Sequence, residues 1–248
     1  MRSRLGRAIF VMLVQWQLYL SPETFAADEM AKRSLVVVEL FTSEGCSSCP
    51  PADKLLEKLR SDDVLVLSFH VDYWNQLGWR DPFSSPEYTI RQRQYAGLFK
   101  LDQVYTPQMI VGGETEFVGS NSKLATAAIS KAKNRRIVQS LTLDVKIDSG
   151  RVQNNYAIGN ATKTTRLNLA LVQKSAVSKA TAGENAGVRL PHVNVVRLFK
   201  SIEVDSSMTG SVEFEIPVGV ENDELFVAGY LQDYATGRIG DATIQPLR

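Results

Sequence analysis

Two cysteines with two residues between them are the part of this sequence best suited to chemistry. Cys46 and Cys49 are the only cysteines among the 248 residues. The spacing lets the two thiols form a disulfide in a small ring, which is easier to reduce than a bridge that closes a long loop. The motif indicates reversible thiol–disulfide chemistry, with a permanent disulfide and a pair of metal ligands as the alternatives.

The cysteines stand between a predicted strand and a predicted helix. Residues 36–42 are β-branched and almost continuously apolar, as in a buried parallel strand. Residues 52–59 place Leu55, Leu56 and Leu59 on one face of a helix. The motif therefore lies at the end of a strand, where an open α/β sheet places its functional groups.

The next elements continue the same pattern. A buried strand is predicted over 64–71 and a helix over 85–99. Thr106-Pro107 then precedes a predicted hairpin of strands 108–111 and 116–118 around Gly112-Gly113, and a helix follows over 121–133.

This order of elements resembles the thioredoxin superfamily over residues 34–135, on the strength of Cys46-Ser47-Ser48-Cys49 and of Thr106-Pro107. The resemblance implies that Pro107 has a cis peptide bond and lies against the cysteine pair, and that the Thr106 backbone binds an extended substrate. The segments 39–46, 70–74 and 78–83 resemble more closely a secreted thioredoxin-like family of bacteria with no assigned function.

The resemblance also assigns roles to the two sulfur atoms and to one acid. Cys46 is expected to be the exposed nucleophile, and Cys49 is expected to resolve the mixed disulfide from a more buried position. Glu39 lies within the apolar strand, seven residues before Cys46, close to where thioredoxins have a buried acid. A carboxyl in that setting is suited to exchange a proton with Cys49, while the alternative is that Glu39 faces outward or is simply hydrogen-bonded.

Two tryptophans and a histidine follow the second predicted strand. Trp74 and Trp79 either wall a substrate cleft or cap the core. His70 can extend the cysteine pair to a Cys2His copper or zinc site. No second histidine stands at ligand spacing, because His192 falls in the second predicted domain, so the sequence predicts neither a bound metal nor another cofactor.

The first 26 residues have the pattern of a signal peptide. Arg2, Arg4 and Arg7 precede a mostly apolar stretch, 8–20, and Thr24-Phe25-Ala26 offers small residues for cleavage. The apolar stretch is shorter than the ~20 residues that a spanning helix needs. We therefore expect a periplasmic or secreted protein with no stable membrane span after cleavage, an uncleaved anchor being the alternative.

The pattern changes from helices to strands after residue 136. Leu141, Leu143, Val145 and Ile147 alternate with polar residues, which predicts a half-buried strand. Further strands are predicted over 152–158, 166–172, 194–199, 211–216 and 225–231, and 174–189 is interpreted as a mobile loop. The fold class is thus an α/β thioredoxin-like domain, 27–135, followed by an all-β, sandwich-like domain, 136–248.

Charge composition narrows the possible partners. The chain has 28 basic and 27 acidic residues, so it lacks the basic excess typical of nucleic-acid binding. The sequence favours an exported thiol–disulfide oxidoreductase, a reductase or isomerase, acting on cysteine-containing exported proteins or with a membrane redox partner. The alternative from another class is a non-catalytic secreted binding protein in which Cys46–Cys49 only stabilises the strand–helix corner.

Overall fold

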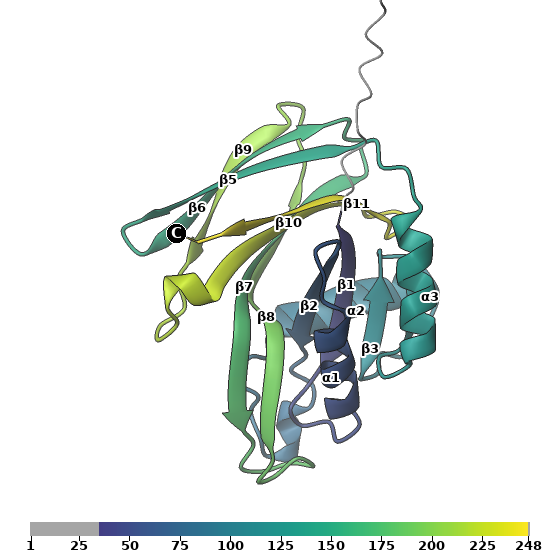
Figure 1. Ribbon diagram of the computed structural model, residues 1–248, viewed down its shortest axis with the longest axis vertical. Helices are drawn as coiled ribbons and strands as arrows, with labels where there is room; N and C mark the ends of the chain where they lie inside the picture. The colour runs from purple at the N-terminus through teal and green to yellow at the C-terminus, as the bar shows by residue number, and fades with distance from the viewer. Residues whose placement is uncertain (1–34, 248) are drawn as a thin grey trace, which may run out of the picture. The chain divides into compact units, whose positions relative to one another are not determined.

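The computed structural model describes residues 35–247. The largest element of this part of the chain is a mixed eight-stranded sheet (Figure 1). Its strand order is β11-β10-β7-β8-β2-β1-β3-β4. In chain order its strands are β1 (Val36–Thr42), β2 (Val64–His70), β3 (Gln108–Val111), β4 (Thr115–Val118), β7 (Thr165–Lys179), β8 (Arg189–Glu203), β10 (Leu225–Asp233) and β11 (Ile239–Pro246). The predicted signal peptide, 1–26, lies outside the described residues.

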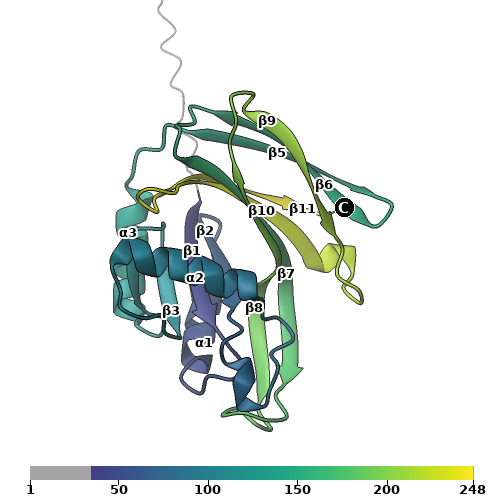
Figure 2. The ribbon, with the colours of Figure 1, turned by 180° about the vertical axis from the view of Figure 1, so that it is seen from behind.

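Three helices cover the strands that come first in the chain. Helices α1 (Pro50–Leu59) and α3 (Ser122–Lys133) pack on one face of β1 and β2, and α2 (Pro86–Phe99) packs on the other. Figure 1 shows α1 in front of β1 and β2 and α3 beside β3, and Figure 2, the view from behind, shows α2 on the other face. Both strands are buried along their whole length, which explains their continuous apolar sequences. None of the described helices is long and apolar enough to cross a membrane.

A second, three-stranded antiparallel sheet forms another layer. It consists of β5 (Ser140–Asp148), β6 (Arg151–Gly159) and β9 (Thr209–Glu215), in the order β5-β6-β9. Leu141 and Leu143, from the alternating pattern of β5, share one apolar core with Leu169 of β7 and Val227 of β10. The described chain is therefore a mixed, predominantly β fold with an α/β core.

The large sheet continues across the boundary predicted at residues 135 and 136. Strand β8 pairs in parallel with β2 at Ser68 and Val195, and the Asn194 side chain donates a hydrogen bond to the Val66 carbonyl at 2.9 Å. Strands β7, β8, β10 and β11 thus extend the sheet that β1 to β4 begin.

Two local predictions about the second half differ from the structure. The segment 174–189 is a loop only over 180–188, because β7 extends to Lys179 and pairs with β8 along a ladder that ends at Arg189. The sequence did not predict strand β11, because Gly240 and Asp241 interrupt its apolar pattern. Its pairing with β10 makes it a strand.

Two short 3-10 helices, η1 (Asn75–Leu77) and η2 (Asn222–Glu224), complete the described elements.

Candidate functional site

The candidate site lies where β1 ends and α1 begins. Cys46 and Cys49 form a disulfide with their Cα atoms 5.4 Å apart. Cys49 caps α1, and its carbonyl accepts hydrogen bonds from the amides of Ala52 at 2.8 Å and Asp53 at 3.1 Å. Pro50 is the first helical residue, a position where proline removes no helical hydrogen bond. The helix therefore holds the second cysteine in place.

Both cysteines are buried in this disulfide form. Cys46 and Cys49 are each 0% exposed, so the expectation of an exposed Cys46 was wrong. Their neighbours Ser47 and Ser48 are exposed, and the Ser48 hydroxyl lies 3.3 Å from the Cys46 sulfur. A partner must therefore reach Cys46 past the loop that carries these serines or past the segment that lies against it.

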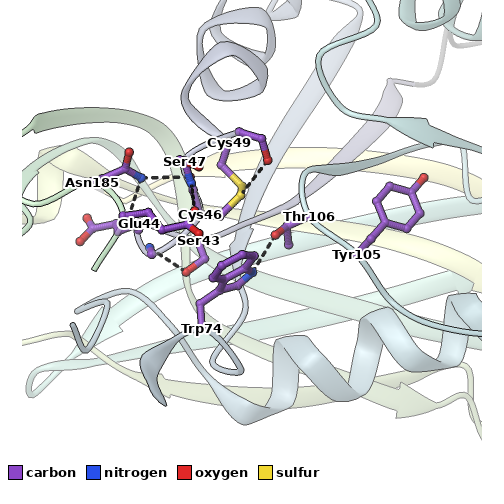
Figure 3. The surroundings of a disulfide bond; sticks show 12 residues. Ser43, Glu44, Cys46, Ser47, Cys49, Trp74, Tyr105, Thr106 and Asn185 are labelled. Carbon is purple, nitrogen blue, oxygen red and sulfur yellow. Dashed lines mark hydrogen bonds between the residues drawn. A yellow bond between two sulfur atoms is a disulfide. The ribbon is translucent and has the colours of Figure 1, made fainter. Parts of the chain in front are cut away.

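That segment is the connection between β7 and β8, residues 180–188, here called the hairpin tip. The Asn185 side-chain amide donates hydrogen bonds to the carbonyls of Glu44, at 2.8 Å, and Cys46, at 2.9 Å (Figure 3). The Ser47 amide donates to the Glu184 carboxylate at 2.9 Å, and hydrogen bonding from Ser47 lowers the pKa of Glu184. Sequence reasoning missed these contacts, because no local pattern indicates a pairing between residues almost 140 positions apart.

The Thr106–Pro107 corner lies beside the cysteine pair. Its peptide bond is cis, as the family resemblance implies. Figure 3 shows Thr106 and Trp74 next to the disulfide, and the Trp74 indole donates to the Thr106 hydroxyl at 2.8 Å. A Cβ atom on Gly119 would lie 3.2 Å from both Pro107 and Ala52 of α1, so this corner also packs closely on the helix after the cysteines. Binding of a substrate by Thr106, Pro107 and Trp74 stays a prediction.

Trp79 contacts an acid of the cysteine loop. Its indole donates to the Glu44 carboxylate at 2.7 Å, and Glu44 is buried. Although Glu44 stands in a loop, two residues before Cys46, its side chain is shielded from solvent. Trp79, like Trp74, is half-buried, and its described contact holds the cysteine loop.

The Glu39 side chain lies on the face of the sheet opposite to the helix that follows the cysteines. Its side chain shares the α2 face of β1 with Val37 and Phe41, whereas α1, which follows Cys49, lies on the other face. The Glu39 carboxylate accepts hydrogen bonds from Arg91 Nε at 2.8 Å and Arg91 Nη2 at 3.0 Å. The hydroxyls of Tyr95 and Tyr230 also donate to it. None of these contacts involves sulfur, so the geometry matches the hydrogen-bonded alternative and not a proton exchange with Cys49.

A partly buried acid does lie on the α1 side of the sheet. Asp53 lies in the first turn of α1, and its side chain has an oxygen with no hydrogen-bond partner among the described residues. Burial raises the pKa of this carboxyl, although the charges of His192 and His70 act in the opposite direction. Asp53 is therefore a better candidate than Glu39 for holding a proton near the cysteines.

A polar cluster joins the cysteine loop to β2 and β8. The Glu44 amide donates to Asp81 Oδ2 at 2.9 Å, and the same oxygen lies 2.7 Å from His70 Nδ1. The Glu44 carboxylate lies 3.2 Å from His192 Nε2, and the rings of His70 and His192 are 4.6 Å apart. The two histidines thus meet although they are far apart in sequence. Within residues 35–247 no group of three or more His, Cys, Asp or Glu side chains is arranged to hold a metal ion.

Asp81→Asn is expected to lower the free energy of unfolding by about 3 kcal/mol near about pH 6, because it breaks a buried ion pair. Burial alone would lower the pKa of His70, but the Asp81 charge and hydrogen bond outweigh it and the net shift is upward. Burial opposes ionisation of Asp81, but the charge and hydrogen bond of His70 outweigh it and lower the pKa of Asp81.

The sign of the pH dependence follows from these shifts. The His70 contribution is complete below its unfolded pKa and is lost as the pH rises through its higher folded value. The Asp81 contribution is lost only as the pH falls through its lowered folded value. Urea unfolding should therefore show a larger loss in Asp81→Asn at about pH 6 than at about pH 9, while Asp62→Asn, at an exposed position, changes little. An equal loss at both pH values would contradict a charged pair.

Two of the comparisons with known proteins extend over most of the described residues. The model of the family described as "Protein of unknown function (DUF1223)" matches residues 37–232. A thioredoxin of Methanocaldococcus jannaschii is 27% identical over 100 residues, which are 40% of this chain and 98% of that protein. A crystal structure of a protein from Agrobacterium tumefaciens is similar with a TM-score of 0.65 and 27% identity, over 88% of this chain and 97% of that chain. The family match therefore includes both the cysteine motif and the hairpin tip.

Proposed function

We propose that this chain, which belongs to the DUF1223 family of proteins of unknown function, is an exported thiol–disulfide oxidoreductase of the reductase or isomerase type. The observation that carries the proposal is the bonded Cys46–Cys49 pair between β1 and α1, beside the cis Thr106–Pro107 corner. The similarity to a thioredoxin over 100 residues supports it.

The proposed reaction uses the reduced form of the pair. The Cys46 thiolate attacks one sulfur of a partner's disulfide, the partner's other sulfur leaves as a thiolate, and a mixed disulfide forms. The Cys49 thiolate then attacks Cys46, which releases the partner as a dithiol and leaves Cys46–Cys49 oxidised. Two electrons pass to the partner. Asp53, whose pKa is raised by burial and whose amide donates to the Cys49 carbonyl, is the proposed acceptor of the Cys49 proton. A second dithiol, or a membrane redox partner, returns the pair to the reduced form.

The proposed location and partners rest on the amino-terminal sequence. The signal-like pattern of residues 1–26 supports export to the periplasm or beyond. Disulfides persist in such compartments, so cysteine-containing exported proteins are the proposed substrates.

One observation favours a second candidate function. Both cysteines are fully buried, which is unusual for a disulfide that must meet protein partners. In a non-catalytic binding protein the Cys46–Cys49 disulfide is permanent, so both cysteines can stay buried. An oxidoreductase would have to expose Cys46 to its partners. The two candidates differ in whether the bridge turns over.

The test is an expected asymmetry between two single variants. Cys49→Ser leaves the attacking thiol but removes the resolving one, so it should accumulate mixed disulfides with exported proteins, whereas Cys46→Ser should accumulate few. Both are expressed with the native amino terminus, quenched in acid and compared on non-reducing gels, with the double serine variant as the blank.

The reduction potential of the pair gives an independent answer. A value in the range of roughly −270 to −180 mV supports turnover, and one below about −300 mV is typical of a structural bridge. Absence of adducts from both variants, together with such a low potential, would reject the oxidoreductase and leave the binding protein.

A further inference from the structure

A cavity of about 360 Å³ lies on the α2 side of the large sheet, apart from the cysteine site. Its volume falls within the roughly 300–1,000 Å³ that is usual for small-molecule sites. Its lining comes from α2, β7, β8, β10 and the turn after β10, and consists of Arg91, Gln94, Tyr95, Gly97, Leu98, Arg166, Ser201, Gln232 and Tyr234. None of these residues belongs to the cysteine loop, the Thr106–Pro107 corner or the hairpin tip.

The cavity is lined by hydrogen-bond donors that the protein does not use. Arg91 binds Glu39, Tyr95 and Gln232 through Nε and Nη2, and no described hydrogen bond uses its Nη1. Arg166 donates to Glu203 through Nη2, while its Nε is buried without a partner among the described residues. A buried donor without an acceptor is costly, so an acceptor supplied by a ligand would be stabilising here.

The charges around the cavity favour an anion. No aspartate or glutamate is among the lining residues. Glu39 balances Arg91 from within the core, but the partner of Arg166, Glu203, has a side chain that is 80% exposed. An exposed ion pair contributes little, so a ligand carboxylate can compete with Glu203 for the planar guanidinium.

The rest of the lining is apolar and aromatic. Tyr95 and Leu98 of α2 contribute one wall. The Tyr234 ring contributes another, with its centre 5.1 Å from the Arg166 guanidinium carbon. A flat apolar group next to an anionic group matches this arrangement of walls and donors.

We propose that this cavity binds a small aromatic carboxylate, whose carboxylate accepts hydrogen bonds from Arg166 and Arg91 while its ring packs between Tyr95, Leu98 and Tyr234. This site is separate from the proposed redox function.

Calorimetric titration of the purified protein with benzoate tests the proposal, with benzamide as a neutral compound of the same shape. Benzoate should bind with saturation, and benzamide should bind at least about tenfold more weakly. Arg166→Gln should weaken benzoate binding by about tenfold or more, while Arg151→Gln, which removes an exposed arginine of β6, should leave it unchanged. Glu203→Gln should strengthen binding, because it frees the Arg166 guanidinium.

Two further variants make the result decisive. Ser201→Trp is designed to fill the cavity while both arginines are kept, and it should abolish benzoate binding. It provides a second test in case Arg166→Gln alters the fold. The double variant Cys46→Ser/Cys49→Ser should bind benzoate as the native protein does, so failure of the redox proposal leaves this one unaffected. The proposal is overturned if benzoate does not saturate the protein, if benzamide binds equally well, or if both Arg166→Gln and Ser201→Trp bind benzoate normally.

Discussion

Arg91→Met is expected to lower the free energy of unfolding by about 4 kcal/mol, because it leaves the Glu39 carboxylate buried without its cationic partner. The two side chains are 5% and 0% exposed, and the guanidinium donates two hydrogen bonds to the carboxylate. Four aromatic rings surround the guanidinium carbon at 4.7 to 5.8 Å, those of Phe69, Tyr95, Phe199 and Tyr230. Urea unfolding at neutral pH measures the loss.

Two controls separate the unpaired charge from the lost packing. Arg93→Met changes an exposed arginine of the same helix and should have little effect. Glu39→Gln/Arg91→Met removes both charges and keeps an acceptor for the Tyr95 and Tyr230 hydroxyls, so it should recover most of the stability. A double variant as unstable as Arg91→Met would show that the aromatic packing of Arg91, and not the unpaired carboxylate, dominates.

Asn185→Ala is expected to accelerate reduction of the Cys46–Cys49 disulfide by dithiothreitol about 30-fold. The Asn185 amide donates two hydrogen bonds to the backbone of the cysteine loop. At about 1 kcal/mol each, they stabilise the closed hairpin tip by about 2 kcal/mol. Since about 1.4 kcal/mol corresponds to a factor of ten, their loss should raise the population of open, reducible protein by that 30-fold.

The rate is measured by alkylating the free thiols at intervals after dithiothreitol is added. Asn160→Ala serves as the control, because Asn160 also donates from its side chain to a carbonyl, that of Val138, far along the chain from the cysteines. A changed rate in both variants would indicate a general loss of stability. An unchanged rate in Asn185→Ala would mean that the hairpin tip does not limit access to the disulfide.

Local patterns in the sequence were sufficient for the first half of the fold. The buried run 36–42 is strand β1, and the strands predicted at 64–71 and 108–111 and the helix predicted over 85–99 differ from the observed elements by at most one residue at either end. Continuous apolar runs and helical periodicity depend only on neighbouring residues, which is why they are readable without a structure. The position of the cysteine motif between a strand and a helix followed from the same patterns.

The surroundings of that motif were decided by tertiary structure alone. The sequence left open whether Glu39 is a buried acid near Cys49 or faces outward. The answer depends on how the helices pack on the sheet, which places Glu39 on the face of β1 that α2 covers. The segment 174–189 has a polar, small-residue composition that predicts a loop. Its middle part is a loop, but the pairing of β7 with β8 on either side brings Asn185 of that loop and His192 of β8 to the cysteine loop.

Contacts between residues more than 100 positions apart leave no local signal in a single sequence, because each partner has an ordinary composition in its own neighbourhood. The sequence by itself therefore determined the cysteine pair, the strand and helix that hold it and the kind of chemistry to test. Only the tertiary structure decided that the pair is buried, that the hairpin tip is hydrogen-bonded to its loop, and that Asp53 and not Glu39 lies on its side of the sheet.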